Sequence, residues 1–346
     1  MMKNKKKVFI LMGGKSPEHE ISLISGKEVV KNLDNNKFEV LPVIVSRDSG
    51  TWKLVSPNNL LDARNPLDLK GTRKELQVKE AKNITSLKVL DEENNRPIVF
   101  IAMHGPFGED GTIQGMLELS DLKYTGSGVL ASALGMDKVM FRKVLEKENI
   151  PIPKYIVLKK REKLVNLRKR IGIYPYFVKP SNQGSSVGSS IAKNRKQLQN
   201  AISEAFMYSE SILIDEYLKG REVTCGLLGN DNPLALPLVE IIPKKGNFFD
   251  YKSKYYAGGA EEIVPAKIAK KLSDKIQKTS IKVHKILGCK GFSRVDFIIK
   301  DNKYPIVLEI NTIPGLTPMS LLPKAAKAAG ISYKKLLEKI IKYAEE

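Results

Sequence analysis

The sequence has few cysteines, few histidines and no long apolar run, and each shortage excludes a class of protein. Two cysteines, Cys225 and Cys289, are too few for a disulfide framework, and no CxxC pair is present. Three scattered histidines do not suit a typical zinc site, so a metal here would be a hard cation with oxygen ligands. The longest apolar run, Ile98–Met103, is too short to span a bilayer, and no signal-peptide cleavage pattern follows the basic start. We therefore expect a soluble cytoplasmic protein that does not insert into membranes.

Acidic residues are scarce relative to basic ones, which gives a formal net charge of +20. Such a charge can indicate a polyanionic partner, such as nucleic acid, a membrane surface or a phosphorylated substrate. Most of the basic residues are lysines spread along the chain, and no basic stripe interleaved with aromatic residues is present. We therefore favour a lysine-rich solvated surface and expect no specific nucleic-acid partner.

What is present is the composition and pattern of a globular α/β protein. Apolar residues make up 42% of the 346 residues and charged residues 28%, enough for two or three lobes with a buried core. Near the N-terminus, strand-like segments over Lys7–Met12, Phe38–Val45 and Pro97–Met103 alternate with helical patterns. This alternation predicts an open, mostly parallel α/β sheet.

Beyond residue 135 the strand-like segments are more closely spaced. We expect strands over Tyr176–Lys179, Ser211–Asp215, Glu222–Leu228, Leu234–Ile242, Ser293–Ile299 and Ile306–Ile310. We expect helices over Asp137–Glu148 and Ile268–Leu287, a loop over Tyr255–Glu262, and an amphipathic helix beginning at Tyr333. The pattern predicts a multi-lobed α/β enzyme divided into residues 1–135, 136–217 and 218–346, with clefts between the lobes.

Four polar residues near the C-terminus form the strongest local pattern. Arg294 and Asp296 share one face of a strand, as do Glu309 and Asn311, because side chains two residues apart point the same way. If the turn between the strands holds two residues, Arg294 lies opposite Glu309 and all four side chains face one side. Three oxygen ligands there suit Mg²⁺, and two such ions can bind a transferred phosphoryl group. The alternative is a solvated strand face with an Arg294–Glu309 ion pair.

Three loops are further candidates for ligand binding. The Ser/Gly-rich loop Lys179–Gly188 can present backbone N–H groups to phosphate oxygens, although it is not a Walker A loop and could be a simple surface loop. Gly14–Ser22 leads into a helix start suited to an anionic group, with Glu20 in the first turn. His104–Gly111 follows a strand end, where α/β sheets place ligands, but it also fits a tight turn. We interpret His284 and the two cysteines as buried structural residues.

The order of motifs along the chain is more specific than any one of them. From about Lys7 to Lys342 it contains GGKSPEHEIS, HGPFGEDG, GMDK, FVKPSNQGSSVG, DEYLKGREVT, DYKSKYYAGGAEEIVPA, GFSRVDF and EINTIPGLTPMSLLP. In this combination the sequence resembles the D-alanine–D-alanine ligase family of the ATP-grasp superfamily. The resemblance implies an N-terminal substrate-binding α/β domain followed by central and C-terminal lobes that enclose ATP.

The resemblance also implies a reaction, in which ATP and two D-alanines give D-alanyl-D-alanine for peptidoglycan precursors through a D-alanyl phosphate and a tetrahedral intermediate. It implies two Mg²⁺ or Mn²⁺ ions, the loops Gly184–Gly188 and Tyr255–Glu262 as lids over the site, and a homodimer. The residues that it assigns to ATP are Lys138, Lys179, Asp215, Glu216, Tyr217, Leu218, Glu222 and Lys254. The residues that it assigns to the metal ions are Asp296, Glu309 and Asn311.

For the amino-acid substrates, the resemblance implies that Glu20 binds the ammonium of the first D-alanine and forms a hydrogen-bonded network with Ser185 and Tyr255. Arg294 would stabilise the acyl-phosphate and tetrahedral intermediates. Ser320 and Leu321 would receive the second D-alanine, and His104 would lie near the substrates.

The sequence departs from the family pattern at Asp215, where glutamate is common; backbone groups of that segment would still bind much of the adenine. Tyr255 favours D-alanine over D-lactate as the acceptor. D-Lactate or D-serine remains the alternative second substrate.

Overall fold

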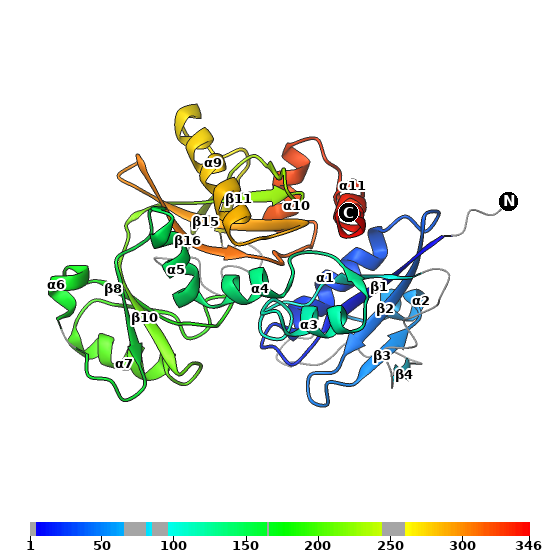
Figure 1. The fold of residues 1–346 in the computed structure, drawn as a ribbon, viewed down its shortest axis with the longest axis horizontal. Helices are drawn as coiled ribbons and strands as arrows, with labels where there is room; N and C mark the ends of the chain where they lie inside the picture. The colour runs from blue at the N-terminus through cyan, green and yellow to red at the C-terminus, as the bar shows by residue number, and fades with distance from the viewer. Residues whose placement is uncertain (1–4, 66–80, 85–95, 165, 244–259) are drawn as a thin grey trace.

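The structure, a computed structural model, describes residues 5–65, 81–84, 96–164, 166–243 and 260–346. The described residues form three β-sheets with flanking helices. We call the parts built on these sheets the N-terminal lobe (β1–β6), the central lobe (β7–β10) and the C-terminal lobe (β11–β16). The N-terminal and central lobes lie at opposite ends of the molecule, and the C-terminal sheet lies between them (Figure 1).

The sheet of the N-terminal lobe has the strand order β4-β3-β2-β1-β5-β6. Its strands are β1 (Lys6–Gly13), β2 (Phe38–Val45), β3 (Trp52–Val55), β4 (Ala81–Ile84), β5 (Ile98–Ile101) and β6 (Lys123–Tyr124). Its helices are α1 (His19–Asn32), α2 (Pro57–Asp62), α3 (Thr112–Leu119) and α4 (Val129–Met136). β2, β1, β5 and β6 are parallel, while β3 and β4 add antiparallel strands at one edge. The predicted open, mostly parallel sheet is thus confirmed.

The central lobe is a smaller antiparallel sheet of order β7-β10-β8-β9. Its strands are β7 (Tyr155–Lys159), β8 (Tyr176–Pro180), β9 (Ser190–Ala192) and β10 (Ser211–Glu216). Its helices are α6 (Leu167–Ile171) and α7 (Arg195–Ala205), and α5 (Lys138–Lys147) precedes it in the chain. A compact apolar cluster lies between this sheet and α7.

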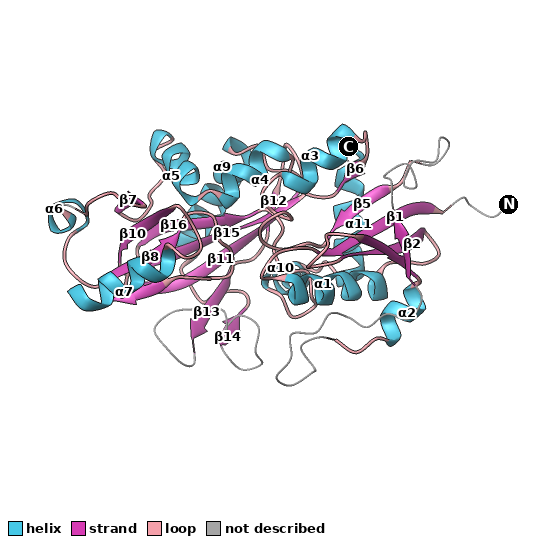
Figure 2. Cartoon of the chain, turned by 90° about the horizontal axis from the view of Figure 1, so that it is seen from below, coloured by secondary structure: helices cyan, strands magenta, loops and turns pink. Residues whose placement is uncertain are grey.

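The C-terminal lobe is built on the sheet β14-β13-β11-β15-β16, with β12 paired to β11. Its strands are β11 (Gly220–Leu228), β12 (Leu234–Ala235), β13 (Val239–Pro243), β14 (Ala260–Ile263), β15 (Phe292–Lys300) and β16 (Tyr304–Asn311). Its helices are α9 (Lys270–Ile286), α10 (Leu321–Ala328) and α11 (Tyr333–Glu345). Figure 2 shows helices on both sides of the strands, with α5, α9, α4 and α3 on one side and α7, α10 and α1 on the other.

Two predicted elements of this lobe need correction. The strand expected over Leu234–Ile242 is two strands, because Pro237 between them has no N–H to donate to a ladder. The loop expected over Tyr255–Glu262 ends in a strand, since Ala260–Ile263 pairs with β13. Residues 255–259 of that loop lie outside the described residues.

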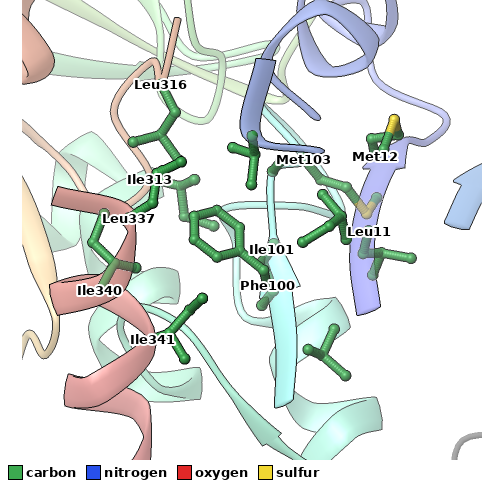
Figure 3. Packing of buried hydrophobic residues seen from close by; sticks show 14 of the residues in the cluster. Leu11, Met12, Phe100, Ile101, Met103, Ile313, Leu316, Leu337, Ile340 and Ile341 are labelled. Carbon is green, nitrogen blue, oxygen red and sulfur yellow. The ribbon is translucent and has the colours of Figure 1, made fainter. Parts of the chain in front are cut away.

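The hydrophobic cores do not follow the order of the chain. The terminal helix α11 packs Leu337, Ile340 and Ile341 toward Phe100 of β5, so the end of the chain covers the N-terminal sheet (Figure 3). Similarly, Phe141 of α5 belongs to the core of the C-terminal lobe. The ends of adjacent lobes are therefore held together by apolar packing, which stabilises the arrangement around the cleft between them.

The buried polar residue His284 has the structural position that we predicted. It lies on α9, and its Nδ1 atom is 2.8 Å from the Ser293 hydroxyl. Burial lowers the pKa of His284 to about 4. Cys225 and Cys289 are buried free thiols, also as predicted. Among the described residues, no helix is long and apolar enough to cross a membrane.

This lowered pKa makes the stability of the fold depend on pH. Between pH 7 and 5 the unfolded chain takes up a proton on His284 that the folded protein does not bind, so stability falls as the pH falls. We expect His284→Gln to remove about 2 kcal/mol of this decrease, measured by urea unfolding at both pH values. Equal losses in the wild type and the variant would contradict the assignment.

Candidate functional site

A cleft of about 550 Å³ lies between the central and C-terminal lobes. Among the residues that line it are Lys138, Lys179, Asp215, Glu216, Tyr217, Leu218, Glu222, Arg294, Asp296, Glu309 and Leu321, all selected from the sequence. Apolar side chains that were not predicted as site residues also line it: Pro153, Phe177, Ile242, Ile298 and Leu308. The cleft therefore combines apolar walls with a group of cations and carboxylates, which suits a ligand with one planar apolar part and one anionic part.

Two lysines enter the cleft from different elements. Lys138 is the first residue of α5, which begins there because the Asp137 carboxylate accepts hydrogen bonds from the N–H groups of Val139 and Met140. The Lys138 ammonium donates to the carbonyl oxygen of Gln183 at 2.6 Å and lies 3.8 Å from a Glu309 oxygen. Lys179 lies near the end of β8. The Lys138 ammonium thus lies between the Ser/Gly-rich loop and Glu309 of β16, while Lys179 is the first residue of that loop.

Lys179 belongs to a buried charge cluster. Its ammonium lies 3.3 Å from an oxygen of Asp215, and both Asp215 oxygens accept hydrogen bonds from Arg142 at 2.6 and 2.7 Å. Burial lowers the pKa of Lys179 to about 8, against the opposing effect of Asp215. Burial raises the pKa of Asp215, but the charges of Arg142 and Lys179 outweigh it and hold that pKa below its usual value. Asp215 is therefore a carboxylate shared by two cations.

The four polar residues of β15 and β16 do share one face, as predicted, but in a different register. β15 pairs Arg294 with Asn311 and Asp296 with Glu309. Lys300 pairs with Tyr304, so three residues lie in the turn, and an odd number alone would turn one pair to the opposite face. A β-bulge after Asp296 adds one residue on β16 and restores the shared face.

Hydrogen bonds join the residues on this face. Arg294 donates two hydrogen bonds to Asp296, both at 2.7 Å, and the Asn311 amide donates to the same carboxylate at 3.1 Å. The ion pair of Arg294 with Asp296 thus lies within one strand, whereas the alternative interpretation had placed its partner, Glu309, on the neighbouring strand. Asp296 is buried, while the Glu309 side chain keeps 28% of its surface exposed.

The Ser/Gly-rich loop after β8 connects the cleft to the N-terminal lobe. Its residues Gln183 and Ser186 line the cleft, as does Ser189, which directly follows the loop. Ser185 and Ser186 have positive φ angles of 48° and 60°, a conformation that costs non-glycine residues energy and is often found at ligand sites. The Ser185 hydroxyl donates to the carboxylate of Glu18.

This contact corrects one prediction. We expected Ser185 to bond with Glu20, but the Glu20 carboxylate binds Arg47 at 2.5 Å and the contact with Ser185 is made by Glu18. The two carboxylates have different partners because Glu18 is the N-cap of α1, outside the helix, whereas Glu20 lies in its first turn. Glu18 was missed because spacing alone does not show which carboxylate faces a distant loop.

Two glycines bring the backbone close to Glu18. A Cβ atom on Gly105, which has a φ of +73°, would lie 2.5 Å from a Glu18 oxygen, and one on Gly184 would lie 2.7 Å from it. A larger residue at either position would displace the Glu18 carboxylate, and at Gly105 it would also strain the backbone. The Glu18 carboxylate therefore lies where α1, the loop after β5 and the Ser/Gly-rich loop meet.

The remaining predicted residues lie around this meeting point or near the cleft. His104 is buried, with Nε2 2.8 Å from the Ser25 hydroxyl and Nδ1 3.2 Å from the carbonyl oxygen of Ile313. Burial lowers its pKa, but the hydrogen bond to Glu109 and nearby carboxylates outweigh this effect and raise the pKa overall. Ser320 is the N-cap of α10, and its hydroxyl lies 2.9 Å from that of Thr317. Lys254 and Tyr255 lie outside the described residues.

The comparisons with known proteins match almost the whole chain. Residues 7–127 match the family described as D-ala D-ala ligase N-terminus, and residues 144–342 match D-ala D-ala ligase C-terminus. The chain belongs to the D-alanine–D-alanine ligase family. A D-alanine–D-alanine ligase of Caldicellulosiruptor bescii is 39% identical, with 99% of this chain and 96% of the relative covered.

Solved structures of this ligase family have the same fold. The VanG D-Ala:D-Ser ligase of Enterococcus faecalis superposes with a TM-score of 0.80 at 31% identity, covering 99% of this chain and all of the other. The D-alanine–D-alanine ligase of Bacillus anthracis complexed with ATP superposes with a TM-score of 0.75 at 31% identity, covering 98% and 97%. The three lobes thus have the predicted α/β ATP-grasp architecture.

Proposed function

We propose that this protein uses ATP to join two D-alanines into D-alanyl-D-alanine for peptidoglycan precursors. One observation supports this most strongly: the Ser/Gly-rich loop contributes Gln183 and Ser186 to the cleft and places Ser185 on the Glu18 carboxylate. A phosphate-binding site and an ammonium-binding carboxylate are then adjacent. This is the arrangement needed to phosphorylate the carboxylate of an amino acid.

ATP would bind with its adenine between the apolar walls and its phosphates at the lysines. The backbone of residues 215–218 would bind the edge of the base, and Glu222 would bind the ribose. Lys138 and Lys179 line the same cavity as the apolar side chains, so one ligand can contact both groups. Their ammonium groups, together with loop N–H groups, would bind phosphate oxygens, and Lys254 belongs to the same proposal.

The chemistry needs an activated carboxylate, because a free carboxylate is a poor electrophile. An oxygen of the first D-alanine attacks the γ-phosphorus and ADP leaves, giving D-alanyl phosphate. The free amine of the second D-alanine attacks the acyl carbon to give a tetrahedral intermediate, which collapses by breaking the bond to the phosphate oxygen, and the leaving phosphate takes up the proton that the amine loses. Arg294 would supply positive charge where charge develops on oxygen, and the Ser/Gly-rich loop would exclude water from the acyl phosphate, a role that we also propose for Tyr255.

We propose Glu18, in place of Glu20, as the carboxylate that binds the ammonium of the first D-alanine. Glu18 is buried at the meeting point of three segments and contacts the loop, whereas the carboxylate of Glu20 is already bound to Arg47. Ser320, Leu321 and His104 would surround the second substrate.

The face of β15 and β16 suits Mg²⁺ or Mn²⁺. Asp296 and Glu309 lie opposite each other, and Asn311 adds an amide oxygen, so the donors are the hard oxygen atoms that these ions prefer. Among the described residues no three His, Cys, Asp or Glu side chains converge, so phosphate and water would complete the coordination. Bound there, two ions would neutralise charge on the phosphates.

A second acceptor is supported by one observation, the similarity to the D-Ala:D-Ser ligase of Enterococcus faecalis. The two functions are distinguished by incubating the protein with ATP, Mg²⁺ and D-alanine, alone or with D-serine or D-lactate, and identifying products by mass spectrometry. We expect D-alanyl-D-alanine and ADP from D-alanine and neither from L-alanine. A mixed product formed in preference would transfer the assignment to the other acceptor.

We also propose a cytoplasmic homodimer. ATP and the free amino acids are cytoplasmic substrates, and Leu119 of α3 and Leu130 of α4 leave 93% and 70% of their surfaces exposed. A second copy packed against α3 and α4 would bury both leucines. A mass of 38.6 kDa in sedimentation equilibrium, that of the monomer, would contradict the dimer.

A further inference from the structure

Arg142 is the largest fully buried side chain among the described residues, yet it carries a charge. It extends from α5, and its guanidinium group binds both oxygens of Asp215 at 2.6 and 2.7 Å. The ring of Tyr155 lies 4.9 Å from the guanidinium carbon. Because removing charges from water costs as much as their attraction returns, a buried ion pair contributes little to stability by itself. The role of this pair therefore has to be inferred from where it lies in the fold and not from its contribution to stability.

Asp215 and Lys179 line the cleft, and Arg142 lies behind them. The three groups form a chain from the interior to the cleft: Arg142 binds Asp215, and Asp215 lies 3.3 Å from the Lys179 ammonium. With two cations and one carboxylate, the cluster keeps one net positive charge when Lys179 is protonated. Only Lys179 can present that charge to a ligand.

We propose that Arg142 is a positioning residue for the nucleotide: through Asp215 it holds the Lys179 ammonium at the wall of the cleft and leaves its charge available to phosphate. The proposal rests on the proposed function, in which ATP occupies this cleft. Without Arg142, Asp215 would pair one-to-one with Lys179, neutralise it and draw it away from the ligand. Asp215 is then mainly an anchor for Lys179, because both of its oxygens already accept hydrogen bonds from Arg142.

The pKa values agree with this geometry. Burial lowers the pKa of Lys179 to about 8, the charge of Asp215 raises it, and the charge of Arg142 lowers it further. The charge of Arg142 therefore offsets part of the stabilisation that Asp215 gives to the protonated form of Lys179.

The test compares variants of the full-length protein by direct calorimetric binding of ATP and by kinetics. Arg142→Met leaves Asp215 without its main partner and could fail to fold, so the decisive variant is Arg142→Met with Asp215→Asn, which removes both charges at similar volume. We expect the double variant to unfold near the wild-type temperature but to bind ATP roughly 10- to 100-fold more weakly, the loss expected for one misplaced charged hydrogen bond. The KM of the double variant for D-alanine should stay within about twofold of the wild-type value. The single variant Arg142→Lys, which keeps the charge, should bind ATP more tightly than the double variant but less tightly than the wild type.

A second comparison separates positioning from general packing. In a Lys179→Met background the same double substitution should weaken ATP binding no further, because the residue through which Arg142 acts is absent. Wild-type ATP affinity in the double variant, or the same loss in both backgrounds, would overturn the proposal. If the wild-type protein binds no ATP, the proposed function fails instead, so the two failures are distinguishable.

Discussion

Replacing Glu309 by glutamine is expected to lower kcat for phosphate release by about a thousandfold, equal to roughly 4 kcal/mol of lost transition-state stabilisation. Glu309 lies opposite Asp296 in the strand pairing and 3.8 Å from the Lys138 ammonium, so its charge serves both the proposed metal site and the phosphate-binding lysine. The variant should also need more Mg²⁺ for half-maximal activity. Steady-state kinetics over a Mg²⁺ titration measures both effects.

Glu148→Gln is the matched control for this experiment. Glu148 also pairs with a lysine, at 3.1 Å from Lys282, but it lies on the surface outside the cleft. It should keep kcat and the Mg²⁺ requirement of the wild type. Activity of Glu309→Gln within a few-fold of Glu148→Gln would refute the metal assignment.

Glu18→Gln is expected to raise KM for D-alanine about a hundredfold, because a buried carboxylate that binds an ammonium group loses its charge. Glu18 is 5% exposed, and its carboxylate contacts the Ser/Gly-rich loop through Ser185. The affinity for ATP should change much less, since Glu18 does not line the cleft. Initial rates at varied D-alanine concentration and saturating ATP give the KM for D-alanine.

Glu20→Gln serves as the comparison, because it changes the neighbouring carboxylate two residues along the same helix start. Its carboxylate binds Arg47 at 2.5 Å, so the change should lower the unfolding temperature and raise KM only a few-fold. The reverse ranking of the two variants would show that the ammonium lies at Glu20 and that the original prediction was right.

The site could be predicted from the sequence where local periodicity determines side-chain direction. Arg294 and Asp296 share a face because they are two residues apart on one strand, and their ion pair follows. The register of the partner strand was more difficult to predict, because it depends on a three-residue turn and on a β-bulge that compensates for the odd number of residues in that turn. The alternation of side chains along a strand does not reveal a β-bulge. The predicted shared face was therefore correct, although the predicted register was wrong.

Contacts between distant segments were beyond the sequence pattern. Helix α11 was predicted from its apolar spacing, but nothing in that spacing shows that it packs on β5 of the N-terminal lobe. Arg142 looks like a surface arginine on an amphipathic helix, and its partner Asp215 is 73 residues away. Glu18 likewise required the position of a loop more than 160 residues later.

The most direct test of the proposed reaction follows the carboxylate oxygen of D-alanine. The protein is incubated with ATP, Mg²⁺ and D-alanine labelled with ¹⁸O at both carboxylate positions, and the phosphate and dipeptide are analysed by mass spectrometry. If the carboxylate is activated as an acyl phosphate, each released phosphate carries one ¹⁸O, and the new peptide carbonyl retains the other. Unlabelled phosphate, label in AMP, or ATP turnover without D-alanyl-D-alanine would contradict the account.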